Sequence, residues 1–341
     1  MRAVVFSDLH CHPWPAFSRL DESGTNTRLR DTLLVLELVS KTAIERNADC
    51  IIFAGDFFHT QKIEAEVLHL AAETLASFSI NIPILAIEGN HDQAAKIMNL
   101  TSVSGLRVPS QWNWLRNLDL RCRGIHIWGV PYGSEAFPKP IPDIAVMHRG
   151  VHGAQVSDYF LSGFEHDLKL EDAHLYAKKL VICGHYHKPQ FFENDVKVLI
   201  PGSPLQHTWG DAGQDRGIWV IDVDDKVNCE FVPLDLPKFI RITDKNIDDL
   251  ANAEGNFVSV EFANKADTGM LDELIKDLSK STRGFSVMAG TPEVTRPVGE
   301  RMKISSDLES VVKEYAKKYG QNYNPKSLEE TGLDLLRRAR G

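Results

Sequence analysis

The chain begins with an apolar run that leads into two metal-ligand types of residue, in the stretch Ala3-Val4-Val5-Phe6-Ser7-Asp8-Leu9-His10. A short apolar run that ends in polar residues is typical of a buried strand in a parallel sheet. The same arrangement returns before Gly55-Asp56, before Gly89-Asn90-His91-Asp92, before His148 and before Gly184-His185-Tyr186-His187. Because open α/β sheets bind ligands outside the carboxyl ends of their strands, we expect these residues to meet at one rim.

Outward from these motifs, residues 1–235 alternate between strand-like and helix-like patterns, which favours an α/β fold. The predicted strands are Ala3–Phe6, Cys50–Ala54, Pro83–Ile87, Ile125–Val130, Ile144–Met147, Leu180–Cys183, Val196–Ile200 and Gly217–Ile221. Apolar positions at helical spacing predict a helix with Leu29, Leu33, Leu36 and Ile44 on its buried face. The same reasoning predicts a second helix at residues 64–78.

The pattern changes after residue 235. A smaller α/β unit is predicted at 236–296, with strands at Phe239–Thr243, Phe257–Phe262 and Phe285–Ala289 and a helix at Met270–Leu278. Residues 297–341 are predicted to form a helical tail. One tail helix carries Leu308, Val311, Val312, Tyr315 and Tyr319 on one face, and a second spans Ser327–Arg338. We therefore expect three parts, at 1–235, 236–296 and 297–341.

The composition is that of a globular protein with a large core. Of the 341 residues, 43% are hydrophobic and 25% are charged, which excludes a mainly disordered chain. No apolar run reaches the roughly 18–20 residues of a membrane span. The five cysteines are scattered and form no CxxC pair, which favours a reducing cytoplasm over a disulfide framework. Because the net charge is −9, a nucleic-acid substrate would need bound metal, basic patches or a partner to offset repulsion.

The residues that follow the strands are imidazoles, carboxylates and one amide. This set suits Mn²⁺, Fe²⁺ or Zn²⁺ better than an all-oxygen Ca²⁺ site or a thiolate zinc site. It exceeds what one ion needs, so we expect two ions that share a bridging carboxylate. Each motif alone also fits an ordinary turn or a polar pair in the core, but their ordered recurrence favours a metal centre. His12 is interpreted as structural, and the background histidines are His69, His126, His152, His166, His174 and His207.

The ordered motifs around Asp8, Asp56, Asn90, His148 and His185 resemble the calcineurin-like metallophosphoesterase superfamily, over about residues 1–205. Within it, the segments Gly55-Asp56-Phe57-Phe58-His59 and Pro201-Gly202-Ser203-Pro204 resemble the SbcD nuclease branch. The compact length, the brief helical tail and the segment Thr208-Trp209-Gly210-Asp211, running to Arg216-Gly217-Ile218-Trp219, resemble the phage-like form of that branch. That resemblance implies a two-sheet α/β sandwich core flanked by helices, a small α/β capping domain and a helical C-terminal tail. It also implies a Mn²⁺-dependent DNA exonuclease and endonuclease subunit that works in DNA repair and recombination.

The resemblance assigns a role to each motif residue. Asp8, His10 and His187 would hold the first ion, Asn90, His148 and His185 the second, and Asp56 would bridge both. His91 would face the scissile phosphate, Asp92 would orient His91, and His59 would contact the substrate or assist beside the ligands. The segment Cys11-His12-Pro13-Trp14 departs from the branch, which leaves the substrate preference open. Phe57-Phe58-His59 and Asp92 argue against a Ser/Thr phosphatase.

The resemblance also implies partners. Residues 236–296 would help to grip DNA, and the tail helices would dock on an SbcC-like SMC-type ATPase. A homodimer is expected through the helices at 64–78 or 93–104, inside a bacterial cell or a phage-infected host. Two alternatives stay open from the sequence: a small-molecule or cyclic-nucleotide phosphodiesterase, and a recombination scaffold whose metal site is vestigial.

Overall fold

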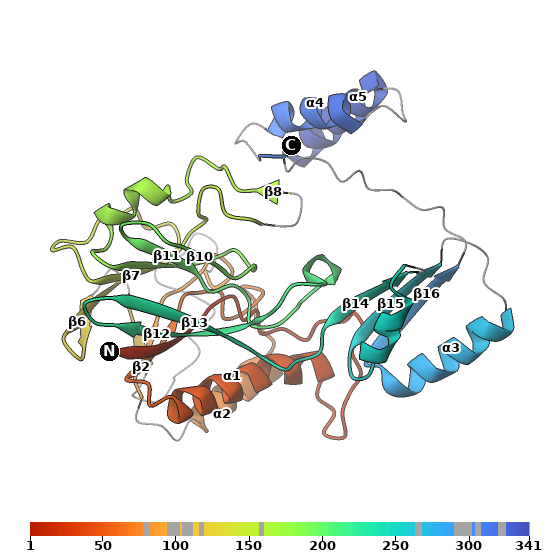
Figure 1. Ribbon diagram of the computed structural model, residues 1–341, viewed down its shortest axis with the longest axis horizontal. Coiled ribbons are helices and arrows are strands. Elements are labelled where there is room, and N and C mark those ends of the chain that lie inside the picture. The colour runs from red at the N-terminus through yellow and green to blue at the C-terminus, as the bar shows by residue number, and fades with distance from the viewer. Residues whose placement is uncertain are drawn as a thin grey trace.

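The computed structural model describes residues 1–77, 82–93, 103, 112–115, 119–156, 160–243, 245–262, 268–289, 302–303, 308–319 and 325–340. Figure 1 shows three parts: a core of two sheets, a three-stranded unit beside it, and a pair of tail helices. Within the described residues, no helix is both long enough and apolar enough to cross a membrane.

The first sheet of the core carries the N-terminal strand near its middle. Its strands run in the order β13-β12-β1-β2-β3-β4. Their bounds are β1 Arg2–Phe6, β2 Cys50–Phe53, β3 Ile84–Ala86, β4 Trp112–Trp114, β12 Gly217–Val223 and β13 Val227–Pro233. Strands β1 to β4 are parallel to one another, whereas β12 is antiparallel to both β1 and β13. The carboxyl ends of β1, β2 and β3 therefore meet at one edge.

The second sheet stacks on the first. Its strands run in the order β10-β11-β9-β7-β6-β5. Their bounds are β5 Asp119–Cys122, β6 Ile125–Val130, β7 Ile144–His148, β9 Leu180–Gly184, β10 Gln190–Phe192 and β11 Lys197–Ile200. Strands β6, β7, β9 and β11 are parallel, and the edge strands β5 and β10 are antiparallel to their neighbours.

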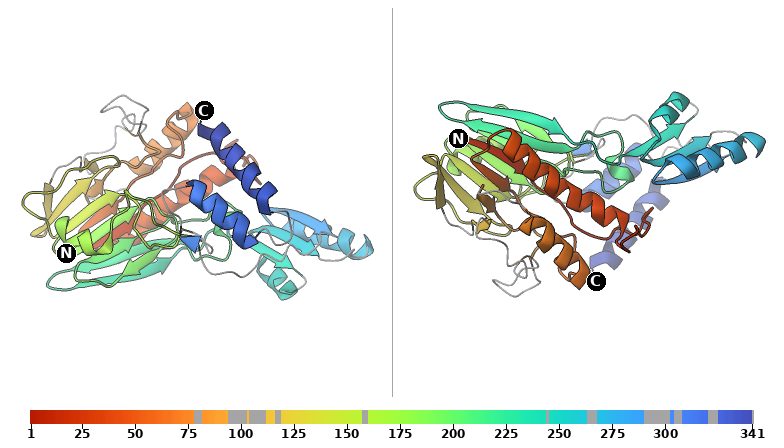
Figure 2. Two further views of the ribbon diagram at one scale, coloured as in Figure 1. Left: turned by 90° about the horizontal axis from the view of Figure 1, so that it is seen from above. Right: turned by 90° about the horizontal axis from the view of Figure 1, so that it is seen from below.

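Alternate side chains of β1 and β2 pack in opposite directions, because successive side chains of a strand point to opposite faces. Val5 and Ile52 pack between the sheets, in one cluster with Ile144 and Ile182 of the second sheet. Other side chains of these strands pack against α1 (Thr27–Glu45) and α2 (Ala65–Ala76). Figure 2 shows α1 and α2 lying side by side over the first sheet. Both faces of β1 and β2 are therefore buried, as their continuous apolar runs predict.

Helix α1 begins after Asn26, whose side chain accepts hydrogen bonds from two backbone amides of the first turn. Three residues predicted for its buried face, Leu29, Leu33 and Leu36, are buried. The prediction for Ile44 is wrong, since its side chain is 51% exposed. Ile44 lies in the last turn of the helix, two residues before the cap at Arg46, where neither sheet covers it.

A parallel sheet of three strands forms the second unit, with β14 Phe239–Thr243, β15 Phe257–Phe262 and β16 Gly284–Ala289. Helix α3 (Thr268–Ser281) connects β15 to β16 and adds Leu278 to the core of the unit. The unit docks on the two-sheet core through aromatic and polar contacts, among them the rings of Phe239 and Trp209, whose centroids lie 4.9 Å apart. Arg283 Nη2 lies 3.0 Å from Asp31 Oδ1 of α1, and the amide of Phe239 donates to Gln206 Oε1 at 2.6 Å.

The tail consists of α4 (Leu308–Tyr319) and α5 (Pro325–Arg340), which pack together. A Cβ at Gly332 of α5 would lie 2.6 Å from Val312 of α4. Part of the apolar face predicted for docking is therefore used between the two helices, while Tyr315 stays 50% exposed. Before the tail, β17 (Met302–Lys303) pairs with β8 (Phe160–Leu161) of the core.

The predicted fold class is confirmed: a two-sheet α/β core flanked by helices is joined by a small α/β unit and tail helices. The strands that sequence patterns missed are β4, β5, β8, β10, β13 and β17. They are short or lie at a sheet edge, where fewer side chains are buried and the apolar pattern is weak. The predicted helix at 64–78 corresponds to α2, whereas most of the helix predicted at 93–104 lies outside the described residues.

Candidate metal centre

Five strands bring the predicted ligands to one rim. Asp8 and His10 follow β1, Asp56 follows β2, Asn90 follows β3, His148 ends β7, and His185 and His187 follow β9. Backbone hydrogen bonds tie the first two segments together, since the amide of Asp8 donates to Gly55 O at 2.9 Å and that of His10 to Asp56 O at 3.1 Å. Residues that are as much as 179 positions apart in the sequence (Asp8 to His187) therefore become neighbours.

The ligand atoms face one another at short distances. His10 Nε2 lies 3.1 Å from His187 Nε2, and His148 Nε2 lies 3.2 Å from Asp56 Oδ2. Asn90 Oδ1 lies 3.0 Å from a ring nitrogen of both His148 and His185. The ligand atoms of Asp8, His10 and His187 lie within 4.8 Å of one another, as do those of Asp8, Asp56 and His148. Imidazole nitrogens, carboxylate oxygens and one amide oxygen in this arrangement fit borderline divalent cations.

The backbone at the rim is strained. Asp8, His10, Asp56 and His185 have φ angles of 52°, 47°, 60° and 102°, in the region that residues other than glycine rarely adopt. Such a conformation costs on the order of 1–3 kcal/mol per residue, persists only where the surroundings enforce it, and clusters at functional sites. Here the strained residues are four of the seven predicted ligands.

Glycines of the motifs leave room for the ligands of the neighbouring motif. A Cβ at Gly89 would overlap the carboxylate of Asp56. A Cβ at Gly184 would overlap the carbonyl oxygen of Ala54 and lie 2.7 Å from His148 Nδ1. Gly89 of the GNHD motif is therefore required by the close approach of the loops after β2 and β3, and Gly184 of the GHxH motif by the close approach of the two sheets.

Burial and mutual charge set the protonation of the ligands. Burial lowers the pKa of His148, but the charge of Asp56 and its hydrogen bond outweigh burial and raise the pKa to about 9. Burial, followed by the neighbouring histidines, lowers the pKa of His10 well below its usual value. Burial and the charge of His148 also lower the pKa of His185. His10 and His185 are therefore neutral at pH 7, which is the form that binds a metal ion.

His91 and His59 lie beside the ligands, with stacked rings whose centroids are 5.2 Å apart. The amide of His91 donates to Asp56 Oδ1 at 2.8 Å, and its Nδ1 lies 2.6 Å from the carbonyl oxygen of His59. An Nδ1–H donated to that carbonyl would orient the His91 ring. Burial, followed by the charges of His12 and His91, lowers the pKa of His59 to about 4.

Asp92 is fully buried, and its carboxylate accepts hydrogen bonds from the backbone amides of Gly89, Phe57 and Phe58 at 3.0–3.1 Å. These hydrogen bonds join the loop after β2 to the loop after β3, and the carbonyl of His59 is the group on His91 Nδ1. That Asp92 orients His91 stays a prediction.

The structure adds a histidine that the sequence analysis treated as background. His207 is 3% exposed, and its ring centroid lies 5.4 Å from that of His10 and 5.8 Å from that of His187. Its Nε2 lies 2.9 Å from Ser203 Oγ. His207 follows no predicted strand, so the motifs did not single it out. The feature of the sequence that could have done so is its position shortly after the segment Pro201-Gly202-Ser203-Pro204. His12 also lies at the rim, with its ring 5.2 Å from that of His59.

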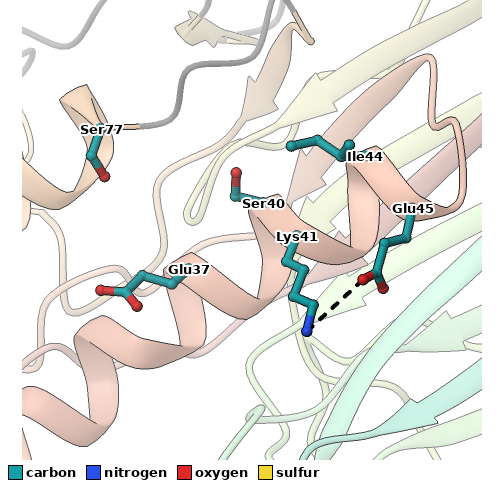
Figure 3. A pocket seen from close by; sticks show the side chains of 6 residues that line it. All are labelled: Glu37, Ser40, Lys41, Ile44, Glu45 and Ser77. Carbon is teal, nitrogen blue, oxygen red and sulfur yellow. Dashed lines mark ion pairs between the residues drawn. The ribbon is translucent and has the colours of Figure 1, made fainter.

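A surface hollow of about 380 Å³ lies away from this rim (Figure 3). It is lined by Glu37, Ser40, Lys41, Ile44, Glu45 and Ser77. These residues come from the C-terminal half of α1 and the end of α2. Because α1 ends just before β2 begins, the hollow lies towards the amino end of β2, opposite the ligands, and takes no part in the metal centre.

The sequence is similar to a curated DNA repair protein. The DNA double-strand break repair protein Mre11 of Archaeoglobus fulgidus is 28% identical over 216 residues, which cover 55% of this chain and 48% of that protein. The chain thus spans about half the length of this curated relative.

Two solved structures are also similar. The Escherichia coli phosphoesterase Yfce is 16% identical, with a TM-score of 0.35 over 66% of this chain and 90% of its own. A dimetal phosphatase from Danio rerio is 9% identical, with a TM-score of 0.41 over 68% of this chain and 98% of its own. The calcineurin-like phosphoesterase family matches residues 1–189, which is more than half of the sequence and contains every predicted ligand, and the chain therefore belongs to this family.

Proposed function

We propose that the protein is a divalent-metal-dependent nuclease that hydrolyses phosphodiester bonds of DNA in end processing, recombination and repair. The observation that carries the proposal is the convergence of Asp8, His10, Asp56, Asn90, His148, His185 and His187 on one rim, with His91 beside them. The likeness to Mre11 supports DNA as the substrate over a small phosphoester.

The proposed roles of the ligands are those that the family resemblance implies, and the closeness of their ligand atoms supports them. Asp8, His10 and His187 would hold one ion, and Asn90, His148 and His185 a second, with Asp56 shared between them. When bound, two such ions supply a hydroxide nucleophile at neutral pH and neutralise the phosphoryl oxygens. Mn²⁺ is the cation we propose, because the resemblance to the SbcD nuclease branch implies it.

His91 is the proposed group on the substrate side. Its Nδ1 is engaged by the carbonyl of His59, so Nε2 is the nitrogen that would meet the phosphate. In its protonated form, His91 would stabilise charge on the phosphate and give a proton to the leaving oxygen. The neutral ring of His59 stacks on His91 and would keep that ring in place.

We further propose that the partners follow the same resemblance. An SbcC-like SMC-type ATPase would dock on the tail helices, where Tyr315 remains half exposed. The unit at 236–296 would help to hold DNA, and a homodimer would form through the region of α2. The proposed place of action is the cytoplasm of a bacterium or of a phage-infected host.

The direct test is degradation of linear duplex DNA by the full chain with Mn²⁺, with and without an SbcC-like ATPase. His91→Ala should slow cleavage by about 10²- to 10⁴-fold, and His174→Ala, which changes an exposed histidine outside α2, should leave it intact. Cyclic nucleotides assayed in parallel test the alternative. If the metal-loaded protein hydrolyses cyclic nucleotides and leaves DNA intact with or without the ATPase, the nuclease proposal is wrong.

A further inference from the structure

Tyr186 stands between two predicted ligands, His185 and His187, and its side chain is only 7% exposed. The side chain packs into the apolar cluster on the outer face of the second sheet, together with Val151 and Leu168. The residue that separates two ligands therefore belongs to the core, although its phenol carries a polar oxygen that needs a partner there.

Ser162 and Asp167 provide that partner. Tyr186 Oη lies 2.5 Å from Ser162 Oγ and 3.2 and 3.3 Å from the two carboxylate oxygens of Asp167. The hydroxyl of Ser162 also donates to Asp167. Each hydroxyl has one proton to give, so a chain in which Tyr186 donates to Ser162 and Ser162 donates to Asp167 satisfies both. We call these three residues the phenol anchor.

The phenol anchor acts next to strained backbone. His185 has a φ angle of 102°, and its amide donates to both carboxylate oxygens of Asp8 at 3.1 Å. On the other side, the carbonyl of His187 accepts from the amide of Ser203 at 2.9 Å. A strained residue relaxes unless contacts on both sides hold it. A buried tyrosine with a bonded phenol, directly after His185, supplies such a contact.

The same anchor reaches the segment that follows His148. A Cβ at Gly150 would lie 2.5 Å from Tyr186 Oη and would overlap Asp167 Oδ1. The chain two residues beyond His148 thus runs directly against the anchor. Three of the seven predicted ligands are carried by segments that meet at Tyr186.

We propose that Tyr186 is a positioning residue, whose phenol, bonded to Ser162 and Asp167, holds His148, His185 and His187 in the arrangement that binds divalent cations. The inference rests on the two-ion centre proposed above and adds a buried determinant of its metal affinity. Groups that orient metal ligands typically change affinity by about 10- to 100-fold when they are removed.

Tyr186→Phe tests the anchor, because it removes the hydroxyl and keeps the ring. Isothermal titration of the metal-stripped full chain with Mn²⁺ should show at least one ion bound about 10-fold more weakly than in the wild type. Tyr176→Phe is the matched control. Tyr176 is 6% exposed in the same cluster and accepts from Arg149 at 3.2 Å, but it does not stand between two ligands. Both variants should lower the melting temperature by a similar amount, and only Tyr186→Phe should lose affinity.

Gly150→Ala gives an independent test of the phenol anchor. If Tyr186→Phe does not fold, Gly150→Ala is the variant that decides whether the anchor sets the metal affinity. It keeps all three anchor residues and displaces Asp167 sterically, so it should weaken Mn²⁺ binding to a similar extent. Wild-type affinity in Tyr186→Phe, or an equal loss in Tyr176→Phe, overturns the anchor; if Tyr186→Phe does not fold, wild-type affinity in Gly150→Ala overturns it. If the wild type itself binds no Mn²⁺, both the two-ion centre and the role of the phenol anchor are wrong. If the wild type and Tyr186→Phe bind two ions equally well, only the role of the phenol anchor is wrong.

Discussion

The stability of the metal-free protein should depend on pH through Asp92. Its carboxylate is fully buried and accepts three backbone amides, from Gly89, Phe57 and Phe58. Burial, reinforced by the negative charge of Asp56, outweighs those hydrogen bonds and raises the pKa of Asp92 from 3.8 to about 7. The folded protein therefore favours the protonated acid, whereas the unfolded chain ionises near pH 4.

The sign and size of this pH dependence follow from the difference between the pKa of Asp92 in the folded protein and its pKa in the unfolded chain. A raised pKa in the folded state contributes stability that is complete below about pH 4 and is lost as the pH rises through about 7. The shift of about 3 pKa units in Asp92 corresponds to about 4 kcal/mol. Asp92→Asn cannot ionise and lacks this contribution. Relative to Asp92→Asn, the wild type should therefore lose up to about 4 kcal/mol of unfolding free energy between pH 4 and pH 8.

Urea unfolding of the metal-stripped proteins at several pH values between 4.5 and 8 measures this difference. Asp225→Asn is the control, because Asp225 is an exposed carboxylate in the turn between β12 and β13. The difference in unfolding free energy between wild type and Asp92→Asn at each pH removes the contribution of the histidines, because these titrate alike in both proteins. A difference in unfolding free energy, wild type minus Asp92→Asn, that stays constant or increases as the pH rises would refute the reasoning. It would mean that the three amide hydrogen bonds keep the carboxylate ionised despite its burial.

Three further outcomes are expected. His91→Ala should lower kcat for DNA by about 10²- to 10⁴-fold while calorimetry still finds two Mn²⁺ ions, because the role proposed for His91 is proton donation and not metal binding. Gly89→Ala should weaken Mn²⁺ binding at least 10-fold in the same titration, since the new Cβ overlaps the Asp56 carboxylate. Leu36→Ala should lower the unfolding free energy in urea by about 2–5 kcal/mol, because Leu36 is 0% exposed; Leu34→Ala, at a 37% exposed position, should cost far less.

The local sequence was enough to predict the strands that carry the ligands. Each of these strands is a short apolar run, because both of its faces are buried, and each is followed by polar residues where the chain leaves the sheet. The chemistry of Asp8, Asp56, Asn90, His148 and His185 could be recognised for the same reason. Edge strands such as β13 could not be predicted in this way, because they bury fewer side chains and show no continuous apolar run.

Only the tertiary structure decided which remote groups support those ligands. His207 lies beside His10, and the phenol of Tyr186 meets Ser162 and Asp167, although nothing in the local sequence pairs them. The sequence by itself determined the ligands and the strands before them, since both are written within a few consecutive residues. The contacts that hold the ligands in place join segments far apart along the chain, and such contacts exist only once the two sheets have packed together.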